Sequence, residues 1–318
     1  MTAPKDHPSE EIMNELSWLT DEFERHRPQL RAVAYRMLGS VTDADDALQD
    51  AWIRLNRTGS NDIDNIGGWL TTIVGRVCID MLRSRRARRE SLIGTWLPEP
   101  VVTIDDGLGP EQAALLADSV GMAMLVVLES LEPTERVALV LHDTFAVPYD
   151  QIAPIVGRSP AATRQLASRA RRRIRGASTT PDPDLGRQRE MVDAFLAAAR
   201  AGDFESLLEL LDPQVVFRVD SGPGKQLAPP LLTGATDVAR QAAATGPRFA
   251  TLCEPCLVNG AAGIIARTSH GVIAVVGMTV IDARIVEIDL MLDAERLATV
   301  DIQEPDRAPA KDPAEGQS

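Results

Sequence analysis

Hydrophobic residues recur at helical spacing through most of the first half of the chain. The spacing i, i+3, i+4, i+7 and i+11, which is typical of a helix with one face against a core, is occupied by Ala44, Ala47, Leu48, Ala51 and Leu55. We place the start of this helix at Thr42, with Asp45 as its capping-box partner. Similar spacing predicts helices over residues 68–89, 113–131 and 149–156, and helices that begin at 133 and 159.

After residue 186 the pattern changes from helical to mixed. Two helical stripes, which include Phe195 and Leu207, come first. Segments rich in Val and Ile and separated by Gly, Asn and Asp then predict strands, over residues 215–219, 250–258, 263–268, 272–281 and 285–292. The chain therefore reads as two helical blocks followed by a domain of helices and strands.

Breaks in composition give the domain boundaries that we expect. The clearest break is GASTTPDPDLG at residues 176–186, which can neither continue a helix nor pack in a core. The resulting division is a flexible N-terminus (1–19), a helical domain (20–92), a linker (93–112), a second helical domain (113–176), a linker (177–186), an α+β domain (187–300) and a disordered tail (301–318).

The net charge of −13 at pH 7 would ordinarily argue against a nucleic-acid partner. Positive charge is nevertheless concentrated in two blocks. Residues 76–90 contain six arginines and two acids, and residues 157–175 contain seven arginines and no acid. These blocks are where a polyanion would bind an otherwise acidic protein.

The second basic block coincides with a helix-turn-helix pattern. A short turn that contains Gly157 joins the helix at 149–156 to the next helix, which begins with Ser159 and Pro160, a typical helix start. Short polar residues near the start of the second helix suit base edges, and arginines further along it suit phosphates. We therefore expect its outward face to contact DNA.

Two features of the first helical block have both a structural and a functional interpretation. Asp43, Asp46 and Asp50 line the outer face of their helix and on periodicity alone would be solvated surface. One or two arginines at the end of the helix 68–89 would simply stabilise its C-terminus. Six arginines exceed that need, which favours phosphate binding.

Cysteine and apolar content argue for a cytoplasmic protein without membrane contact. The three cysteines are too few for a disulfide framework, the residues MTAPKDHPSEE show no signal pattern, and the longest apolar run, 271–281, is much shorter than the ~20 residues of a membrane span. Cys253 and Cys256 have C-x-x-C spacing, but no second ligand pair for a metal accompanies them. In a turn the two thiols could meet as a redox pair, whereas a strand, which we favour, would place them on opposite faces as small buried hydrophobic residues. We expect neither a metal nor another cofactor.

The order of these motifs resembles a known family, the bacterial alternative sigma factors of the extracytoplasmic-function class. Residues 43–52 (DADDALQDAW) resemble the helix with which the family grips the polymerase clamp, and residues 68–86 resemble its promoter-melting helix. Residues 131–175, which begin LEPTER, resemble its region four, which reads the upstream promoter element. The resemblance covers about residues 20–176 and implies core RNA polymerase and promoter DNA as partners.

The resemblance also implies roles for individual residues. The polymerase-binding residues would be Asp43, Asp46, Gln49 and Asp50. The DNA-binding residues would be Arg76, Arg83, Arg85 and Arg86 in the first block, and Ser159, Thr163, Arg164, Gln165, Ser168, Arg169 and Arg172 in the second.

The motif WLPEP at residues 96–100 and the C-terminal extension are similar to a subgroup with an extra polyketide-cyclase-like (SnoaL-like) domain. The implied fold class is multidomain, with two all-α helical domains, the second containing a helix-turn-helix, followed by an α+β cone-shaped domain with a curved antiparallel sheet. Such a cone often encloses an apolar pocket that suits a small ligand.

Residues 220–225 (DSGPGK) resemble the subgroup's Asp-Gly-Gly-Gly-basic loop, although Ser221 and Pro223 depart from it. The simpler interpretation is a turn in which two glycines supply positive φ. The residues through which the subgroup's extension would regulate the chain in cis are Trp96, Pro98, Asp220, Gly222, Gly224 and Lys225.

Three functions remain open at this point. We favour a sigma factor with no catalytic residue of its own, whose C-terminal domain modulates its activity in cis. A one-component regulator with a ligand-binding cone needs only the helix-turn-helix and leaves the other basic helix unexplained. An enzyme needs an acid–base pair in the cone, and no spacing pairs any of Asp220, His270, Asp289 and Asp293.

Overall fold

The computed structural model describes residues 8–58, 63, 65–89, 96–104, 121–177, 182–225, 227–300 and 302–303. Contacts divide the chain into two compact units. The helical unit comprises Met1–Ile93 and Met124–Ser178, and the sheet unit comprises Gly94–Ala123 and Thr179–Ser318. The described part of the segment between the two helical blocks, residues 96–104, therefore belongs to the sheet unit.

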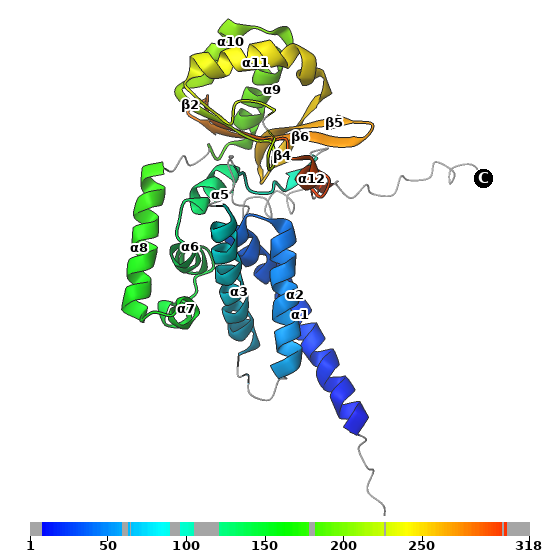
Figure 1. Ribbon diagram of the computed structural model, residues 1–318, viewed down its shortest axis with the longest axis vertical. Coiled ribbons are helices and arrows are strands. Elements are labelled where there is room, and N and C mark those ends of the chain that lie inside the picture. Colours follow the sequence, from blue (N-terminus) through cyan, green and yellow to red (C-terminus); the bar gives the residue numbers. More distant parts are fainter. Residues whose placement is uncertain are drawn as a thin grey trace, which may run out of the picture. The chain divides into compact units, whose positions relative to one another are not determined.

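The helical unit begins with three packed helices and ends in a helix-turn-helix (Figure 1). Buried Leu30, Leu48 and Leu70 form part of the core between the first three helices. Where α3 packs against α7, Gly75 has no side chain and leaves room for Ile155. The helices are α1 (Pro8–Leu38), α2 (Val41–Thr58), α3 (Ile66–Arg89), α5 (Met122–Glu129), α6 (Pro133–Leu139), the π-helical turn Val140–Thr144, α7 (Tyr149–Val156) and α8 (Pro160–Ala177).

The turn between α1 and α2 corrects the helix start that the sequence predicts. Gly39 adopts φ 62° after α1, and the Oγ atom of Ser40 accepts a 3.1 Å hydrogen bond from the backbone N of Asp43. Ser40 is thus the N-cap of α2, two residues before the expected Thr42. Asp45 is not a capping partner, because its carboxylate binds the guanidinium of Arg31 on α1 at 2.7 Å.

The predicted core stripe of α2 is confirmed, since Ala44, Ala47, Leu48, Ala51 and Leu55 are all buried. Residues 8–19, which the sequence assigns to a flexible N-terminus, form the first part of α1.

In the described part of the sheet unit, three helices lie over one face of an eight-stranded sheet, and the short fourth helix lies on the other side (Figure 1). The strands lie in the order β3-β2-β7-β6-β5-β4-β1-β8. The helices are α9 (Leu185–Ala201), α10 (Phe204–Leu210), α11 (Ala235–Phe249) and the short α12 (Ala294–Leu297). The strands are β1 (Val102–Thr103), β2 (Leu211–Asp220), β3 (Leu231–Thr233), β4 (Cys253–Val258), β5 (Ala261–Thr268), β6 (Gly271–Ile281), β7 (Arg284–Met291) and β8 (Ile302–Gln303).

The sheet is mixed, which corrects the expectation of an antiparallel sheet. The hairpins β4–β5, β5–β6 and β6–β7 are antiparallel, but β7 then lies beside β2 in the same direction, and β1 is parallel to β8. Residues expected to form a linker and a tail thus contribute β1 and β8 to the sheet.

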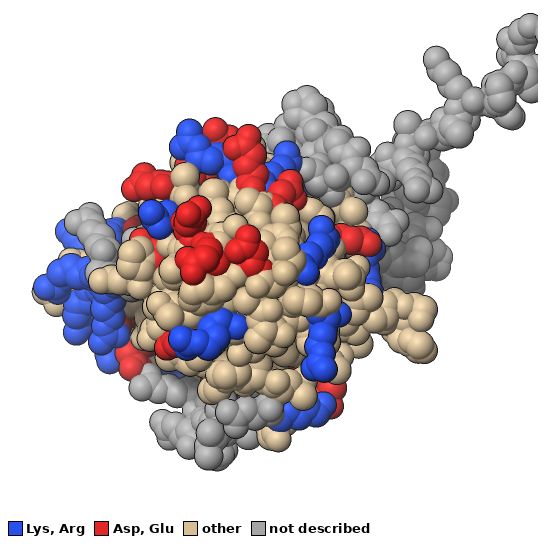
Figure 2. Space-filling model, turned by 90° about the horizontal axis from the view of Figure 1, so that it is seen from above, with Lys and Arg blue, Asp and Glu red and all other residues tan. Residues whose placement is uncertain are grey.

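Apolar side chains fill the space between the sheet and α9, α10 and α11. This core includes Phe195, Leu207, Val215, Ile264 and Ile288. On the outer surface of this helical side, acidic and basic side chains are mixed and form no single basic face (Figure 2). Across the described residues of both units, no helix is long and apolar enough to cross a membrane.

Candidate functional site

Helices α7 and α8 form the helix-turn-helix that the sequence predicts. Gly157 ends α7 in the left-handed conformation, with φ 65°. The Oγ atom of Ser159 accepts a 3.3 Å hydrogen bond from the backbone N of Ala162, so Ser159 caps α8. Leu166 and Ala170 are buried on the inner face of α8, which leaves the opposite face for a ligand.

The outward face of α8 carries most of the side chains expected to contact DNA. Thr163 does not belong to this face, because it is fully buried and its hydroxyl donates a 3.0 Å hydrogen bond to the carbonyl O of Ser159. Its position favours a role in the first turn of α8 over contact with a base. The exposed residues are Ser159, Arg164, Gln165, Ser168, Arg169 and Arg172.

Some arginines of α8 are bound within the helical unit. The carboxylate of Glu135 lies 3.6 Å from Arg169 and 3.0 Å from Arg173. Arg171 binds Asp143 through two hydrogen bonds of 2.6 Å and donates a third, of 2.8 Å, to the hydroxyl of Tyr149. These bonds, first to Asp143 and then to Tyr149, raise the pKa of Arg171.

Two other arginines of the outward face, Arg164 and Arg172, have no acidic partner among the described residues. The guanidinium of Arg164 lies 5.4 Å from the centroid of the Tyr149 ring. The side chains of the helix-turn-helix therefore include both anchored and unpaired cations.

In α3 the arginines expected to contact DNA also fall into different environments. Arg76 is exposed, and its Nη2 atom donates a 3.3 Å hydrogen bond to the carbonyl O of Pro154. The side chain of Arg83 is 62% exposed, and its guanidinium lies 3.9 Å from the carboxylate of Asp80 on the preceding turn. The side chain of Arg86 lies outside the described residues.

Arg85 and Asp43 are bound to each other in the helical unit. The guanidinium of Arg85 forms an ion pair with the carboxylate of Asp43 and donates a 2.6 Å hydrogen bond to the carbonyl O of Leu38, the last residue of α1. Only 16% of the Arg85 side chain is exposed. In this conformation neither side chain is available to an external partner, in contrast to what the sequence implies.

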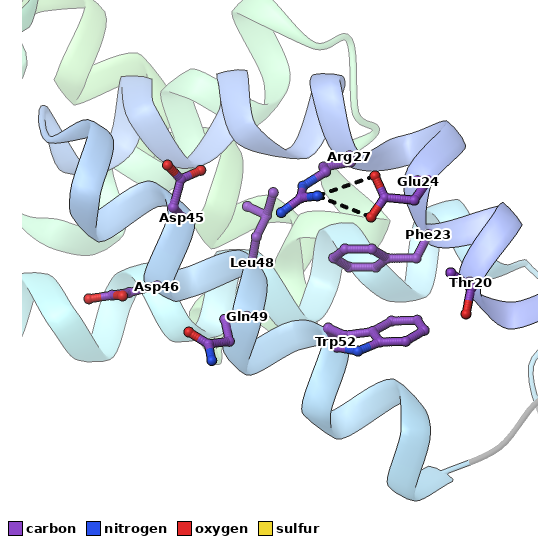
Figure 3. Close-up of a pocket in the computed structure, with 9 residues that line it drawn as sticks. All are labelled: Thr20, Phe23, Glu24, Arg27, Asp45, Asp46, Leu48, Gln49 and Trp52. Atoms are coloured by element: carbon purple, nitrogen blue, oxygen red, sulfur yellow. Dashed lines mark hydrogen bonds and ion pairs between the residues drawn. The ribbon is translucent and has the colours of Figure 1, made fainter. Parts of the chain in front are cut away.

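A groove of about 360 Å³ lies between α1 and α2 (Figure 3). Asp46 and Gln49 are exposed and line the groove, whereas Asp50 is exposed but is not part of its lining. Phe23 and Trp52 meet along one side with ring centroids 5.0 Å apart. The full lining comprises Thr20, Phe23, Glu24, Arg27, Asp45, Asp46, Leu48, Gln49 and Trp52.

The groove combines an apolar side with charges of both signs. Arg27 binds Glu24 at 3.1 Å on α1, and Asp45 and Asp46 of α2 also line the groove. A partner helix with apolar and basic side chains would find complementary groups here.

A second cluster, within the sheet unit, joins the segment 96–104 to the end of β2 and to α12. The carboxylate of Asp220, which is 3% exposed, accepts a 2.9 Å hydrogen bond from the backbone N of Leu97 and a 2.6 Å one from Arg296. Arg296 also donates to the carbonyl O of Leu97, and its guanidinium lies 4.8 Å from the centroid of the Trp96 ring. We call Trp96, Leu97, Asp220 and Arg296 the linker clasp.

The loop that follows Asp220 is the turn that the sequence predicts. Gly222 and Gly224 have φ values of 80° and 70°, and the backbone N of Gly222 donates a 3.0 Å hydrogen bond to Asp220. A Cβ atom at position 222 would lie 2.9 Å from the carboxyl carbon of Asp293, so a side chain would disturb the turn. Lys225 is exposed, and Pro98 is buried.

Further along the segment, Asn259 and β1 hold the chain to the sheet. The side chain of Asn259 accepts a hydrogen bond from the backbone N of Val101, and its own backbone N donates to the carbonyl O of Val101. Val102 then pairs with Val258 of β4. The segment between the two helical blocks is thus held by side-chain and backbone bonds over residues 97–103.

Comparisons with known proteins agree with this arrangement. Residues 23–88 match the family described as Sigma-70 region 2, and residues 121–174 match the family described as Sigma-70, region 4. The chain is 41% identical over 292 residues to the ECF RNA polymerase sigma factor SigJ of Mycobacterium tuberculosis strain H37Rv, which covers 90% of this chain and 92% of SigJ. The chain belongs to the ECF RNA polymerase sigma factors.

Two further comparisons extend over most of the chain of this sigma factor. It is 32% identical over 278 residues to the probable ECF RNA polymerase sigma factor SigI of Mycobacterium tuberculosis strain H37Rv, with 86% of this chain and 92% of SigI covered. The crystal structure of SigJ matches 89% of this chain and 100% of its own, with a TM-score of 0.70 and 35% identity. The predicted family, its C-terminal extension and its fold class are therefore confirmed, and the one-component regulator is not favoured.

The candidate acids and thiols of this sigma factor have structural environments. Asp289 binds Arg218 at 2.9 Å and is 3% exposed, and burial raises the pKa of its carboxyl group to about 6. Asp293 caps α12 through a bond from the backbone N of Glu295. Burial raises the pKa of the Cys256 thiol to about 12. Among the described residues, no group of His, Cys, Asp and Glu side chains could hold a metal ion.

Sequence reasoning missed several residues of these sites. Arg296 completes the clasp but lies 199 positions from Leu97, and no local pattern connects the two. Phe23 and Arg27 line the groove from α1, a helix to which the sequence analysis assigned no role. Tyr149 opens the helix-turn-helix beside two arginines of α8. The only local signal for it was an aromatic residue at the predicted start of a helix.

Proposed function

We propose that this sigma factor binds core RNA polymerase through the groove between α1 and α2 and recognises promoter DNA through α8 and α3. Asp46 and Gln49 are the acidic and polar side chains that the groove presents, and Asp50 extends the same face of α2. A basic surface of the polymerase clamp is the complementary partner. Phe23 and Trp52 supply an apolar contact that charge alone would lack.

For DNA, the proposal assigns the outward face of α8 to the upstream promoter element. Arg164 lies near the start of α8, where a recognition helix reaches base edges, and Arg172 lies two turns further on, where phosphates are met. Gln165 and Ser168 are exposed between them. Arg76 and Arg83 of α3 form the second basic element, which suits a protein that touches two promoter elements at once.

We further propose that the C-terminal unit modulates this activity in cis. The observation that carries the proposal is the linker clasp, which binds the segment between the two DNA-contacting blocks to the sheet unit. The same unit is also joined to the end of α8 through the residues before Leu185. A domain attached at both points can limit how far the two blocks separate, and no separate inhibitory protein is needed for that.

Binding accounts for this function without catalysis. Buried apolar residues line the sheet face under α9, α10 and α11, and each candidate acid serves a structural contact, which argues against an acid–base pair. We therefore propose no catalytic residue and no cofactor. A small ligand in the cone remains a prediction. A protein that works on RNA polymerase and DNA would act in the cytoplasm.

Transcription with purified components tests the main proposal. Core RNA polymerase is given a library of promoter duplexes with and without the full chain, and transcripts are sequenced. The chain should confer selection of particular promoters. Transcripts with the same distribution in both reactions would refute the proposal.

A matched pair of variants tests modulation in cis. Asp220→Ala removes the acceptor of the Leu97 and Arg296 bonds, whereas Asp237→Ala breaks only the exposed ion pair with Arg240 on α11. The clasp variant should change transcription from a selected promoter severalfold, and the control should not. If both variants and the parent chain support equal transcription, the linker clasp has no regulatory role.

A further inference from the structure

Tyr149, the first residue of α7, lies at the centre of a cluster that connects both helices of the helix-turn-helix. Its ring stacks on the imidazole of His142, with centroids 3.9 Å apart and an interplanar angle of 24°. The guanidinium of Arg164 lies 5.4 Å from the centroid of the same ring. The Tyr149 hydroxyl accepts the 2.8 Å hydrogen bond from Arg171. The ring and the hydroxyl thus engage two arginines of α8 that lie seven residues apart.

The segment before Tyr149 has an irregular backbone that sets the position of the ring. Val140–Thr144 forms a π-helical turn, a feature that is frequent at functional sites. Ala146 has a positive φ of 52°, which is unusual for a residue with a side chain. The Nδ1 atom of His142 and the carbonyl O of Val147 lie 3.0 Å apart, which holds the imidazole under the ring. The cluster is therefore built from both local strain and side-chain contacts.

The two arginines in this cluster have different freedom. Arg171 is held by Asp143 as well as by Tyr149, so it is fixed from two sides. Arg164 is exposed and forms no described ion pair, so the ring face of Tyr149 is the contact that orients it. A cation over an aromatic face is stabilised without using its N–H donors, which remain available to a base.

We propose that Tyr149 is a positioning residue for promoter reading: its ring holds the Arg164 side chain in the orientation in which α8 presents it to a base. This inference rests on the proposed DNA contact of α8. An ordered arginine side chain has already lost rotamer freedom, which a free one loses only on binding. Tyr149 therefore affects sequence preference without contacting DNA.

The test compares variants of Tyr149 in a holoenzyme of core RNA polymerase and the full chain. The probe is a set of promoter duplexes randomised across the upstream element, and the bound fraction is sequenced. Arg164→Ala first identifies the base position whose preference depends on Arg164. Tyr149→Leu removes the ring face, and Tyr149→Phe is the matched control, since it keeps the ring and loses only the hydroxyl bond to Arg171.

Tyr149→Leu should reduce the preference at the Arg164-dependent position about two- to fivefold, the factor expected for an exposed cation–π contact. Tyr149→Phe should retain the preference. In the Arg164→Ala background, Tyr149→Leu should cause no further loss at that position. Preferences at other positions should stay unchanged, which a merely structural role of the ring would not produce.

Two results would overturn the inference. One is an unchanged preference in a folded Tyr149→Leu variant, and the other is an equal loss at every position. If Tyr149→Leu does not fold, NMR relaxation of the arginine Nε atoms in the parent chain decides, because Arg164 must be more ordered than Arg172. If the parent holoenzyme selects no sequence, or if Arg164→Ala leaves selection intact, the proposed DNA contact of α8 fails instead.

Discussion

At the scale of single residues, Arg171 and Arg172 show how position on a helix decides what a charge can do. The two arginines are adjacent in the sequence, but Arg171 turns toward Asp143 and Tyr149 while Arg172 is exposed and has no described acidic partner. The first stabilises the helix-turn-helix, and the second is available to a phosphate.

This difference gives a prediction with a built-in control. Arg172→Ala should weaken binding of promoter DNA and lower the slope of log affinity against log salt by about 0.9, because one phosphate contact is lost. Its thermal unfolding should stay the same. Arg171→Ala should instead lower the free energy of unfolding by about 1 kcal/mol, through loss of a partly exposed bidentate pair. DNA binding is measured over a series of salt concentrations, and stability is measured by thermal melts. The assignment would be contradicted if Arg171→Ala changed the salt slope while Arg172→Ala lowered the stability.

A second prediction at this scale concerns Asp289 in the sheet unit. Its carboxylate shares Arg218 with Glu287, whose Oε2 atom is buried without a hydrogen-bond partner. Two buried carboxylates face one guanidinium, and burial raises the pKa of Asp289 to about 6. The folded state therefore favours the protonated acid, and its stabilising contribution is complete below about pH 4 and lost as the pH rises through 6.

Asp289→Asn should remove this pH dependence. A shift of about two pKa units corresponds to a change on the order of 3 kcal/mol in the stability of the sheet unit between pH 4 and pH 6 or above. The measurement is denaturant unfolding from pH 4 to pH 8, and the difference between parent and variant isolates this group from the other acids. Asp237→Asn on α11 is the matched control, and parallel profiles for parent and Asp289→Asn would contradict the prediction.

The sequence predicts which arginines of α8 face outward, but it does not predict which of them form ion pairs. The outward position of Arg164 and Arg172 follows from helical periodicity, because an amphipathic helix fixes which positions face away from its core. Periodicity does not tell which outward arginine meets an acid from another helix. The Arg85 pair with Asp43 and the Arg171 pair with Asp143 depend on contacts between helices, so no local pattern predicts them.

At the scale of elements, α2 combines a buried stripe with an acidic outer face, and both follow from its sequence spacing. The structure adds that α1 supplies the other wall of the groove, with Phe23 and Arg27. Asp46 and Asp50 contribute little to packing, since both are exposed. Changing them should therefore affect a partner without affecting the helix.

Asp46→Arg combined with Asp50→Arg should abolish binding to core RNA polymerase, because two acids that face a basic surface become repulsive. Helical content measured by circular dichroism should not change. Asp80→Arg with Asp150→Arg provides the control, since it makes the same charge change at exposed positions on α3 and α7. If the α2 variant still binds core RNA polymerase in a pull-down, the acidic face of α2 is solvated surface and not a polymerase contact.

The elements themselves were predicted unevenly. Long periodic stretches gave α2, α3, α7 and α8 with small errors at their ends, and Val- and Ile-rich stretches gave the longer strands. Strands β1 and β8 have two residues each and form only through pairing with distant segments. The parallel pairing of β2 with β7 depends on the path of the whole chain, so the hydrophobic pattern of either strand cannot reveal it.

At the scale of the whole molecule, the order of the units along the chain matters more than any one contact. Residues 96–104 lie between the two helical blocks in sequence, yet they are bonded within the sheet unit. In the proposed modulation in cis, the linker clasp is one of the contacts through which the C-terminal unit would act on both blocks. Without the clasp, Asn259 and the pairing of β1 with β4 would still hold residues 101–103 to the sheet unit, but residues 96 and 97 would lose their bonds to it.

Opening the clasp should reproduce part of the effect of removing the C-terminal unit. Truncation after Gly176 should change transcription strongly, and Asp220→Ala should shift it in the same direction, because both release the segment that contains Leu97. Gly222→Pro should do so as well, since proline cannot adopt the φ of 80° found there. Lys225→Glu, at an exposed position, should have the smallest effect.

Amide hydrogen exchange provides the local measurement for this prediction. The backbone N of Leu97 loses its acceptor in Asp220→Ala and should exchange at least about tenfold faster, the change that a loss of roughly 1.4 kcal/mol in protection produces. Val101, whose backbone N is bound by Asn259, should be affected less. If Leu97 exchanges faster while transcription stays at the parent level, the clasp opens without regulatory effect. The C-terminal unit would then act through another surface.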